Sequence, residues 1–149
     1  MPLTKLEHYL VISDDIEATR RFYCDALGMR VGFRPELEFD GYWLYVGDVP
    51  CIHVAERHSY ARYLDAVGIP MSSGERGSGM VDHVAFNGTD FDGMAERLRA
   101  LGIEAHRNDV ADIGLKQLFL VDPSGIKIEL NFMERPRGGA SSATSASEP

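Results

Sequence analysis

Two segments of the chain carry mainly apolar residues at the three- and four-residue spacing of a helix that buries one face. The first contains Ile16, Thr19, Phe22, Tyr23 and Leu27, and the second contains Phe91, Met94, Leu98 and Leu101. Each begins near an aspartate, Asp15 or Asp90, that can accept bonds from the free amides of a first helical turn. Each ends at a Leu-Gly pair, where glycine tolerates a left-handed stop. The pattern predicts one amphipathic helix in each half and a short third helix over residues 60–67.

Between and after these helices the apolar residues alternate with a period of two, which is typical of strands. The expected strands cover residues 6–10, 29–34, 42–46 and 51–55 in the first half, and 81–85, 103–107, 116–121 and 126–131 in the second. Asp122-Pro123-Ser124-Gly125 has the composition of a tight turn between the last two strands. Each half therefore has the order strand, helix, strand, strand, strand, which predicts an α+β fold made of two βαβββ modules.

The two halves also repeat potential metal ligands at matching places. Ile52-His53-Val54 and Ile128-Glu129-Leu130 lie 76 residues apart, and His8 and His83 lie 75 residues apart. In each tripeptide the flanking aliphatic residues point to one side of a strand, so the central polar residue points to the other. If the halves pack with approximate twofold symmetry, the four side chains converge on one concave face.

Imidazole and carboxylate ligands together suit Zn, Ni, Mn or Fe(II), so this face is a candidate divalent-metal site. A single histidine on a strand is more often a structural or surface residue, and only the matched placement favours a metal. His58 and His106 have no counterpart in the repeat, and we expect both to be surface residues.

The length of 149 residues and the 44% hydrophobic content fit one domain with a shared core, because each half alone would be marginal. We expect a single domain over residues 1–133, made of modules 4–57 and 80–133. The connecting segment 58–79 is a linker or, alternatively, a lid over the site. The composition of residues 134–149 predicts a disordered tail.

The net charge of −8 argues against nucleic acid as a partner, since phosphate binding needs clustered Lys and Arg. Arg20, Arg21, Arg97 and Arg99 lie on the predicted helices, where solvated surface charge is the simpler interpretation, although an anionic substrate group could use one or two of them. No apolar run reaches the roughly 20 residues of a membrane span. With no signal-peptide pattern and two cysteines expected to be reduced, we expect a cytoplasmic protein.

Four motifs resemble those of the vicinal oxygen chelate superfamily, which includes glyoxalase I, methylmalonyl-CoA epimerase, extradiol dioxygenases and the fosfomycin and bleomycin resistance proteins. They are Leu6-Glu7-His8, Arg21-Phe22-Tyr23-Cys24-Asp25-Ala26-Leu27-Gly28-Met29, Val81-Asp82-His83-Val84-Ala85-Phe86 and Asp122-Pro123-Ser124-Gly125-Ile126-Lys127-Ile128-Glu129-Leu130. The resemblance covers roughly residues 4–133. It implies a cupped mixed sheet around a divalent metal that the substrate chelates through two neighbouring oxygens. It also implies His8, His83 and Glu129 as metal ligands.

The chain departs from these relatives at two positions. His53 stands where glyoxalase I has a glutamate that binds the metal and moves a proton. Its role is therefore either acid/base catalysis or that of a fourth metal ligand. An imidazole near its reference pKa of about 6.5 can accept and donate protons near neutral pH. Phe119 stands where the extradiol dioxygenases have a tyrosine. Its counterpart in the repeat is Trp43, and we expect Trp43 and Phe119 to form apolar walls of the substrate pocket, although aromatic strand residues are more often plain core.

Three functions remain open from the sequence. The first is a metal-dependent isomerase, lyase or epimerase that transfers a proton on a small substrate chelated through vicinal oxygens. The second is an Fe(II) extradiol-type ring-cleaving dioxygenase. The third is a resistance-type protein that binds a drug without catalysis. All three imply a small-molecule partner, with neither nucleic acid nor membrane, and all three are compatible with a homodimer.

Overall fold

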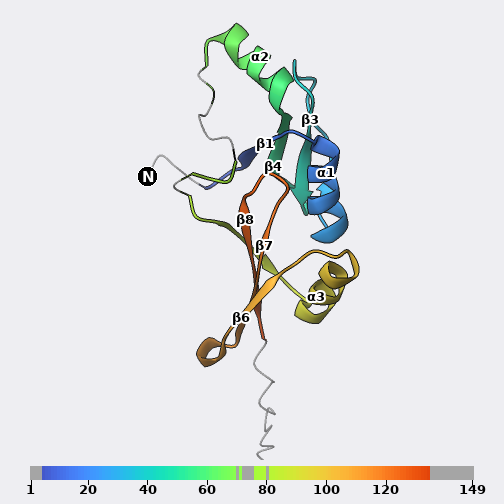
Figure 1. Ribbon diagram of the computed structural model, residues 1–149, viewed down its shortest axis with the longest axis vertical. Coiled ribbons are helices and arrows are strands. Elements are labelled where there is room, and N and C mark those ends of the chain that lie inside the picture. Colours follow the sequence, from blue (N-terminus) through green and yellow to red (C-terminus); the bar gives the residue numbers. More distant parts are fainter. Residues whose placement is uncertain (1–4, 70, 72–75, 80, 135–149) are drawn as a thin grey trace, which may run out of the picture.

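Each half of the chain forms a four-stranded mixed sheet with a helix packed beside it (Figure 1). The structure is a computed structural model that describes residues 5–69, 71, 76–79 and 81–134. The first half contains β1 (Tyr9–Ser13), α1 (Ile16–Arg21), the π-helical segment η1 (Phe22–Ala26), β2 (Arg30–Val31), β3 (Gly41–Val46) and β4 (Val49–Glu56). The second contains β5 (Val84–Gly88), α3 (Phe91–Ala100), β6 (His106–Val110), the short 3-10 segment η2 (Ala111–Ile113), β7 (Leu115–Val121) and β8 (Lys127–Met133).

The two sheets have the same topology. Their strand orders are β1-β4-β3-β2 and β5-β8-β7-β6. The pairs β1–β4 and β5–β8 are parallel, and the other neighbouring strands are antiparallel. The register also repeats, since Trp43 faces His53 across β3 and β4, and Phe119 faces Glu129 across β7 and β8. The predicted α+β fold of two βαβββ modules is confirmed, and each module contributes its own sheet.

The first helix differs from the prediction of one regular helix. Asp15 caps α1 as expected, by accepting a bond from the Ala18 amide at 2.9 Å. After Arg21 the helix widens into η1, and this local change buries Phe22 and Tyr23 together, although they are adjacent in sequence. The segment then stops at Gly28, whose φ of 79° supplies the predicted left-handed ending.

Four predicted strands are placed differently. Those expected over residues 6–10 and 81–85 begin later, as β1 at Tyr9 and β5 at Val84, so His8 and His83 lie just before their strands. Residues 29–34 form only the two-residue β2, because the chain leaves the sheet after the Gly32 amide bonds the Trp43 carbonyl at 3.1 Å. Residues 103–107 are also largely irregular, and β6 begins at His106. The apolar Ile103 suggested a strand there, but Ile103 packs against the core from the turn after α3.

The helix predicted over residues 60–67 exists and is longer. It is α2 (Arg57–Val67), which starts directly after β4 because the Glu56 carboxylate accepts bonds from the His58 and Ser59 amides at 2.9 and 2.7 Å. Most of α2 belongs to the segment expected as a linker or lid. Further along that segment, the Gly77 amide bonds the Ser124 carbonyl at 2.9 Å. Residues 72–75 and the expected tail beyond Glu134 lie outside the described residues.

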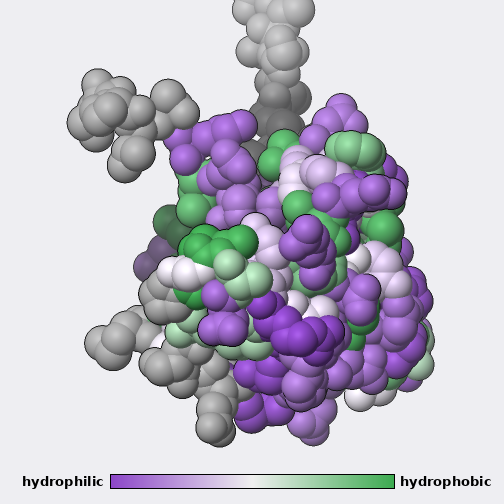
Figure 2. Space-filling model, turned by 90° about the horizontal axis from the view of Figure 1, so that it is seen from above, coloured by the Kyte–Doolittle hydropathy of each residue, from purple (hydrophilic) through white to green (hydrophobic). Residues whose placement is uncertain are grey.

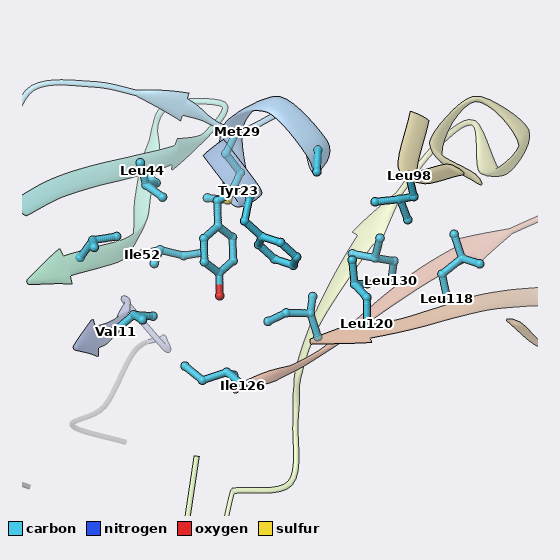
Figure 3. Close-up of a cluster of buried hydrophobic side chains, with 14 of the residues drawn as sticks. Val11, Tyr23, Met29, Leu44, Ile52, Leu98, Leu118, Leu120, Ile126 and Leu130 are labelled. Carbon is cyan, nitrogen blue, oxygen red and sulfur yellow. The ribbon is translucent and has the colours of Figure 1, made fainter. Parts of the chain in front are cut away.

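One apolar core joins the two modules. Figure 3 shows Tyr23 between side chains of the first sheet, such as Leu44 and Ile52, and those of the second, such as Leu130. Tyr23 has no exposed surface, and its hydroxyl donates to Asp122 of the second module at 2.9 Å. The modules therefore complete each other's core.

The surface seen from above the view of Figure 1 is mostly hydrophilic, with separate smaller apolar areas (Figure 2). None of the helices in the described part of the chain has the length and apolar character needed to cross a bilayer.

Candidate functional site

The first module brings His8, His53 and Trp43 into one stack of rings. The His8 and His53 ring centroids are 3.7 Å apart at an interplanar angle of 15°, and those of Trp43 and His53 are 4.0 Å apart at 7°. The alternation of β4 explains the arrangement, since Ile52 and Val54 are buried in the core and His53 points to the opposite face.

Stacking shields the half-buried His53 ring from part of the solvent and changes its protonation. Burial and the neighbouring His8 lower the pKa of His53 to about 4, and the charge of Arg34 acts in the same direction. The imidazole is therefore neutral at pH 7. This corrects the expectation of a pKa near 6.5, which ignored the loss of hydration between two other rings. A neutral imidazole keeps a free lone pair, which can bind a metal or a proton.

The second module brings His83 and Glu129 together. The His83 Nε2 and Glu129 Oε2 atoms are 2.8 Å apart, and the Glu129 side chain is only 12% exposed. The other carboxylate oxygen, Oε1, accepts a bond from the Gln117 amide at 2.9 Å. The Gln117 carbonyl accepts in turn from Asn108 at 2.7 Å, so a short chain of amides fixes the buried carboxylate.

Both candidate histidines are preceded by an acidic residue that contacts the ring nitrogen Nδ1. Glu7 Oε1 lies 3.1 Å from His8 Nδ1, and Asp82 Oδ2 lies 2.8 Å from His83 Nδ1. A carboxylate that accepts from an Nδ1–H leaves Nε2 to bind a metal, which is the arrangement that metal-binding histidines commonly have. The dipeptides Glu7-His8 and Asp82-His83 thus carried a signal that the sequence analysis did not use.

The donor set of the second module fits a divalent cation. Ligand bonds of about 2.0–2.2 Å place neighbouring ligand atoms about 2.8–3.1 Å apart around an octahedral ion and about 3.3–3.6 Å apart around a tetrahedral one. The spacing of 2.8 Å between His83 Nε2 and Glu129 Oε2 agrees with the octahedral value, and it is also the length of a direct hydrogen bond between the two side chains.

The structure does not bring the two pairs together. Within the described part of the chain, no three His, Cys, Asp or Glu side chains lie close enough to hold one metal ion. Each module therefore supplies half of the predicted ligand set. A cavity of about 260 Å³ lies between the modules, but its lining, which includes Met29, Phe86 and Phe132, contains none of the four candidate ligands.

The predicted pocket aromatics lie beside the candidate ligands. Trp43 covers His53, as described above, and Phe119 meets the His83 ring edge-on with centroids 6.4 Å apart. Their role as walls of a substrate pocket remains a prediction. His58 and His106 are at the surface, as expected: the His58 side chain is 79% exposed and contacts Glu56, and His106 is exposed at the start of β6.

Comparison with known families agrees with the fold. Residues 5–130 match the family model of the Glyoxalase/Bleomycin resistance protein/Dioxygenase superfamily. The chain belongs to this superfamily. Its members share a fold that hosts catalytic and non-catalytic proteins, so membership leaves the specific activity open.

Several solved structures of the superfamily resemble this chain. A lactoylglutathione lyase from Agrobacterium tumefaciens is 22% identical, with 88% of this chain and 95% of that chain covered and a TM-score of 0.65. A fosfomycin resistance protein variant from Listeria monocytogenes, solved with Mn(II) and 1S,2S-dihydroxypropylphosphonic acid, is 17% identical, with 89% and 94% covered and a TM-score of 0.64. An antibiotic-binding protein from Streptomyces sp. CB03234 is 16% identical, with 90% and 99% covered and a TM-score of 0.61. At these identities the likeness shows the fold alone. The comparison with curated proteins gives no match.

Proposed function

We propose that the protein is a divalent-metal-dependent, glyoxalase-like isomerase, lyase or epimerase. It would move a proton on a small substrate that chelates the metal through vicinal oxygens. The observation that carries the proposal is the His83–Glu129 pair, with Nε2 and Oε2 2.8 Å apart and Asp82 on the far side of the imidazole. A buried carboxylate beside an oriented imidazole is costly to maintain without a cation to bind.

His8, His83 and Glu129 would hold the cation, which is Fe, Ni, Mn or Zn. When bound, such an ion supplies Lewis acidity that stabilises negative charge on a substrate oxygen. Glu7 and Asp82 orient the two histidines, and Gln117 orients Glu129. The Mn(II) in the similar fosfomycin resistance protein supports a divalent ion in this fold.

His53 would accept the proton that the substrate loses. It is neutral, and its ring is held between His8 and Trp43 on the face that carries the first half of the site. The alternative role as a fourth ligand is separable by experiment. His53→Ala should retain bound metal and lose turnover if His53 moves a proton, whereas the metal content itself should fall if His53 is a ligand.

We further propose that two copies of the chain complete the site as a homodimer. Among the described residues the candidate ligands form two pairs that do not meet, while a catalytic metal site needs at least three protein ligands. A twofold dimer can place the first pair of one copy beside the second pair of the other, because symmetric interfaces join unlike patches reciprocally.

Bound metal and oxygen consumption test the class of activity. The protein is purified without chelators, its metal is measured, and oxygen uptake is recorded with catechols. Ni, Zn or Mn without uptake is the expected result. Iron together with oxygen uptake would replace the proposal with an Fe(II) extradiol-type dioxygenase, although Phe119 offers no hydroxyl beside His83. Absence of metal from a protein that stays folded after His8→Ala or Glu129→Ala would favour a non-catalytic drug-binding protein.

Mixing two inactive variants tests the shared site. His8→Ala breaks the first pair, and Glu129→Ala breaks the second, so neither variant alone should bind the metal tightly. After subunit exchange, half of the dimers are mixed and each has one intact site of two, so about a quarter of the wild-type metal should be bound. No recovery after demonstrated exchange would place the whole site within one chain.

A further inference from the structure

The cavity between the modules is lined mainly by apolar side chains from both of them. Its buried wall includes Met29 of the first module and Leu130 and Phe132 of the second, which are 9%, 5% and 4% exposed. The half-buried Phe86 and Met94 extend this wall. A volume of about 260 Å³ has room for roughly nine non-hydrogen atoms, if each takes about the 30 Å³ of a water molecule. The cavity therefore has the size and lining of a site for a small apolar group.

This cavity lies across the second sheet from Glu129. Side chains alternate along β8, so Leu130 and Phe132 point into the core while Glu129 points to the opposite face. Phe86 is the register partner of Leu130 on β5, and it lies on the same side as Leu130. The sheet itself therefore separates the cavity from the His83–Glu129 pair, and a ligand in the cavity needs no metal.

The cavity opens to solvent beside the turn that joins β3 and β4. Val46 in its lining is 50% exposed, and Gly47 is also exposed. Arg30 lies at this opening and is held by two other lining residues. Its Nη2 donates to the Gly47 carbonyl at 3.2 Å, and its guanidinium carbon lies 4.8 Å from the centroid of the Tyr45 ring. A guanidinium therefore stands where the apolar lining meets water.

A second arginine reaches the same region from α3. Arg97 follows Met94 by three residues, so both lie on one face of the helix. A methyl group added at Gly28, which lines the cavity, would lie 3.2 Å from Arg97 Nη1. The ion pairs in the described part of the chain involve neither Arg30 nor Arg97. In a chain with a net charge of −8, two arginines without acidic partners beside one apolar cavity complement an anionic ligand.

We propose that this cavity is a second ligand site, which binds a small apolar molecule that ends in a carboxylate. The apolar part lies between the modules, and the carboxylate faces Arg30 and Arg97 at the opening. Arginine suits this place because its planar guanidinium presents several donors to the oxygens of one carboxylate. The lining comes from both modules, so a bound ligand stabilises their packing against each other. No bond is made or broken at this site.

The test compares three probes of similar shape and different charge. Phenylacetate, phenylacetamide and 2-phenylethylamine are titrated into the full-length protein by calorimetry, and the melting temperature is recorded with each. With about ten non-hydrogen atoms, phenylacetate should bind with a Kd of about 1 mM. The neutral amide should bind about 10-fold more weakly, and the cationic amine should give no measurable binding. Phenylacetate at about 10 mM should raise the melting temperature, because it binds the folded protein.

Substitutions locate the bound probe. Arg30→Gln and Arg97→Gln should each weaken phenylacetate binding about threefold, and the double variant should bind phenylacetate and phenylacetamide equally. Arg99→Gln is the matched control, because Arg99 lies on the same helix but pairs with Glu96 at 2.6 Å, and it should keep the wild-type preference. Met94→Trp places a larger side chain in the cavity and should abolish binding of both probes. A thermal melt of each variant checks that lost binding does not reflect unfolding.

Glu129→Ala separates this inference from the proposed function. The variant loses a candidate metal ligand but keeps the cavity, so phenylacetate should bind it as tightly as wild type. Binding lost in Glu129→Ala would place the probe at the candidate metal site and refute this inference. A protein that binds no metal but gives the expected results with phenylacetate would refute the proposed function alone.

Three other results would also overturn the inference. The first is equal binding of phenylacetate and phenylacetamide, or binding of neither at about 10 mM. The second is binding that survives Met94→Trp in a folded protein, because the probe would then lie elsewhere. The third is binding that weakens as the protein concentration rises, because a second copy of the chain would then cover the opening.

Discussion

Replacing Gln117 tests whether the amide network on the second sheet prepares Glu129 for a metal. Gln117→Leu keeps the size of the side chain and removes the donor that lies 2.9 Å from Glu129 Oε1. A hydrogen bond to a charged acceptor contributes about 1.5–3 kcal/mol, and each 1.4 kcal/mol is a factor of about ten in a binding constant. The dissociation constant for Zn should therefore rise about 10- to 100-fold, which is also the usual effect of losing a residue that orients a metal ligand.

The assay is competition for Zn against a chromophoric chelator at a protein concentration where wild type and variant have the same oligomeric state. Asn87→Ala is the control, because the Asn87 amide lies on the same sheet but, among the residues that the structure describes, donates only to the Asn131 carbonyl, at 3.4 Å. Gln117 also donates to Asn131 at 3.0 Å, so a loss of stability of about 1 kcal/mol is expected and is measured by urea unfolding. An unchanged Zn affinity in a folded Gln117→Leu protein would refute the reasoning, since Glu129 would then need no support.

Three further predictions concern stability. Backbone amides at the start of α2 lower the pKa of Glu56 to about 2. This carboxylate therefore stabilises the fold at pH values above its ordinary pKa of about 4.5, and the stabilisation is lost as the pH falls toward 2. Glu56→Ala should lower the free energy of unfolding in urea by about 1 kcal/mol at pH 7, and its difference from wild type should narrow between pH 4.5 and 3. Tyr23→Phe should cost about 1–3 kcal/mol, because it removes the Tyr23 donor from Oδ2 of the buried Asp122 carboxyl, whose other oxygen keeps its bonds from the Ser124 and Ile126 amides. An unchanged melting curve would mean that this bond contributes nothing to joining the modules. Gly41→Ala should yield little soluble protein, because a methyl group there collides with the Val54 carbonyl of the neighbouring strand; wild-type yield and melting temperature would contradict the close approach of β3 to β4.

Local chemistry made the helix ends and the sheet faces predictable. Residue type alone predicted the helix cap at Asp15, the left-handed stop at Gly28 and the turn at Asp122. The alternation of apolar and polar residues around His53 and Glu129 predicted which face of the sheet these side chains occupy. These features depend on neighbours in sequence, so the sequence suffices to find them.

Features that depend on distant partners were missed or misplaced. The widening of η1 serves the burial of Tyr23 between two sheets, and the start of β6 is set by its pairing with β7. Gln117 escaped notice for a related reason, since it has no counterpart in the first half and gains its meaning from its contact with Glu129 on the neighbouring strand. The sequence could not show that the candidate ligands separate into two pairs. Periodicity indicates which face of its own sheet a side chain occupies, but it does not indicate how the faces of two sheets lie relative to each other.

The shared core has a consequence for synthesis on the ribosome. Tyr23 is translated early, yet the aspartate that binds its hydroxyl and the apolar residues that cover it from the second sheet emerge about 100 residues later, which at ordinary rates takes about 5–20 s. During that interval the first module has its own strands but an uncovered apolar flank. The nascent chain is then most exposed to aggregation, and a chaperone that covers this flank would raise the yield of folded protein more than one acting after release.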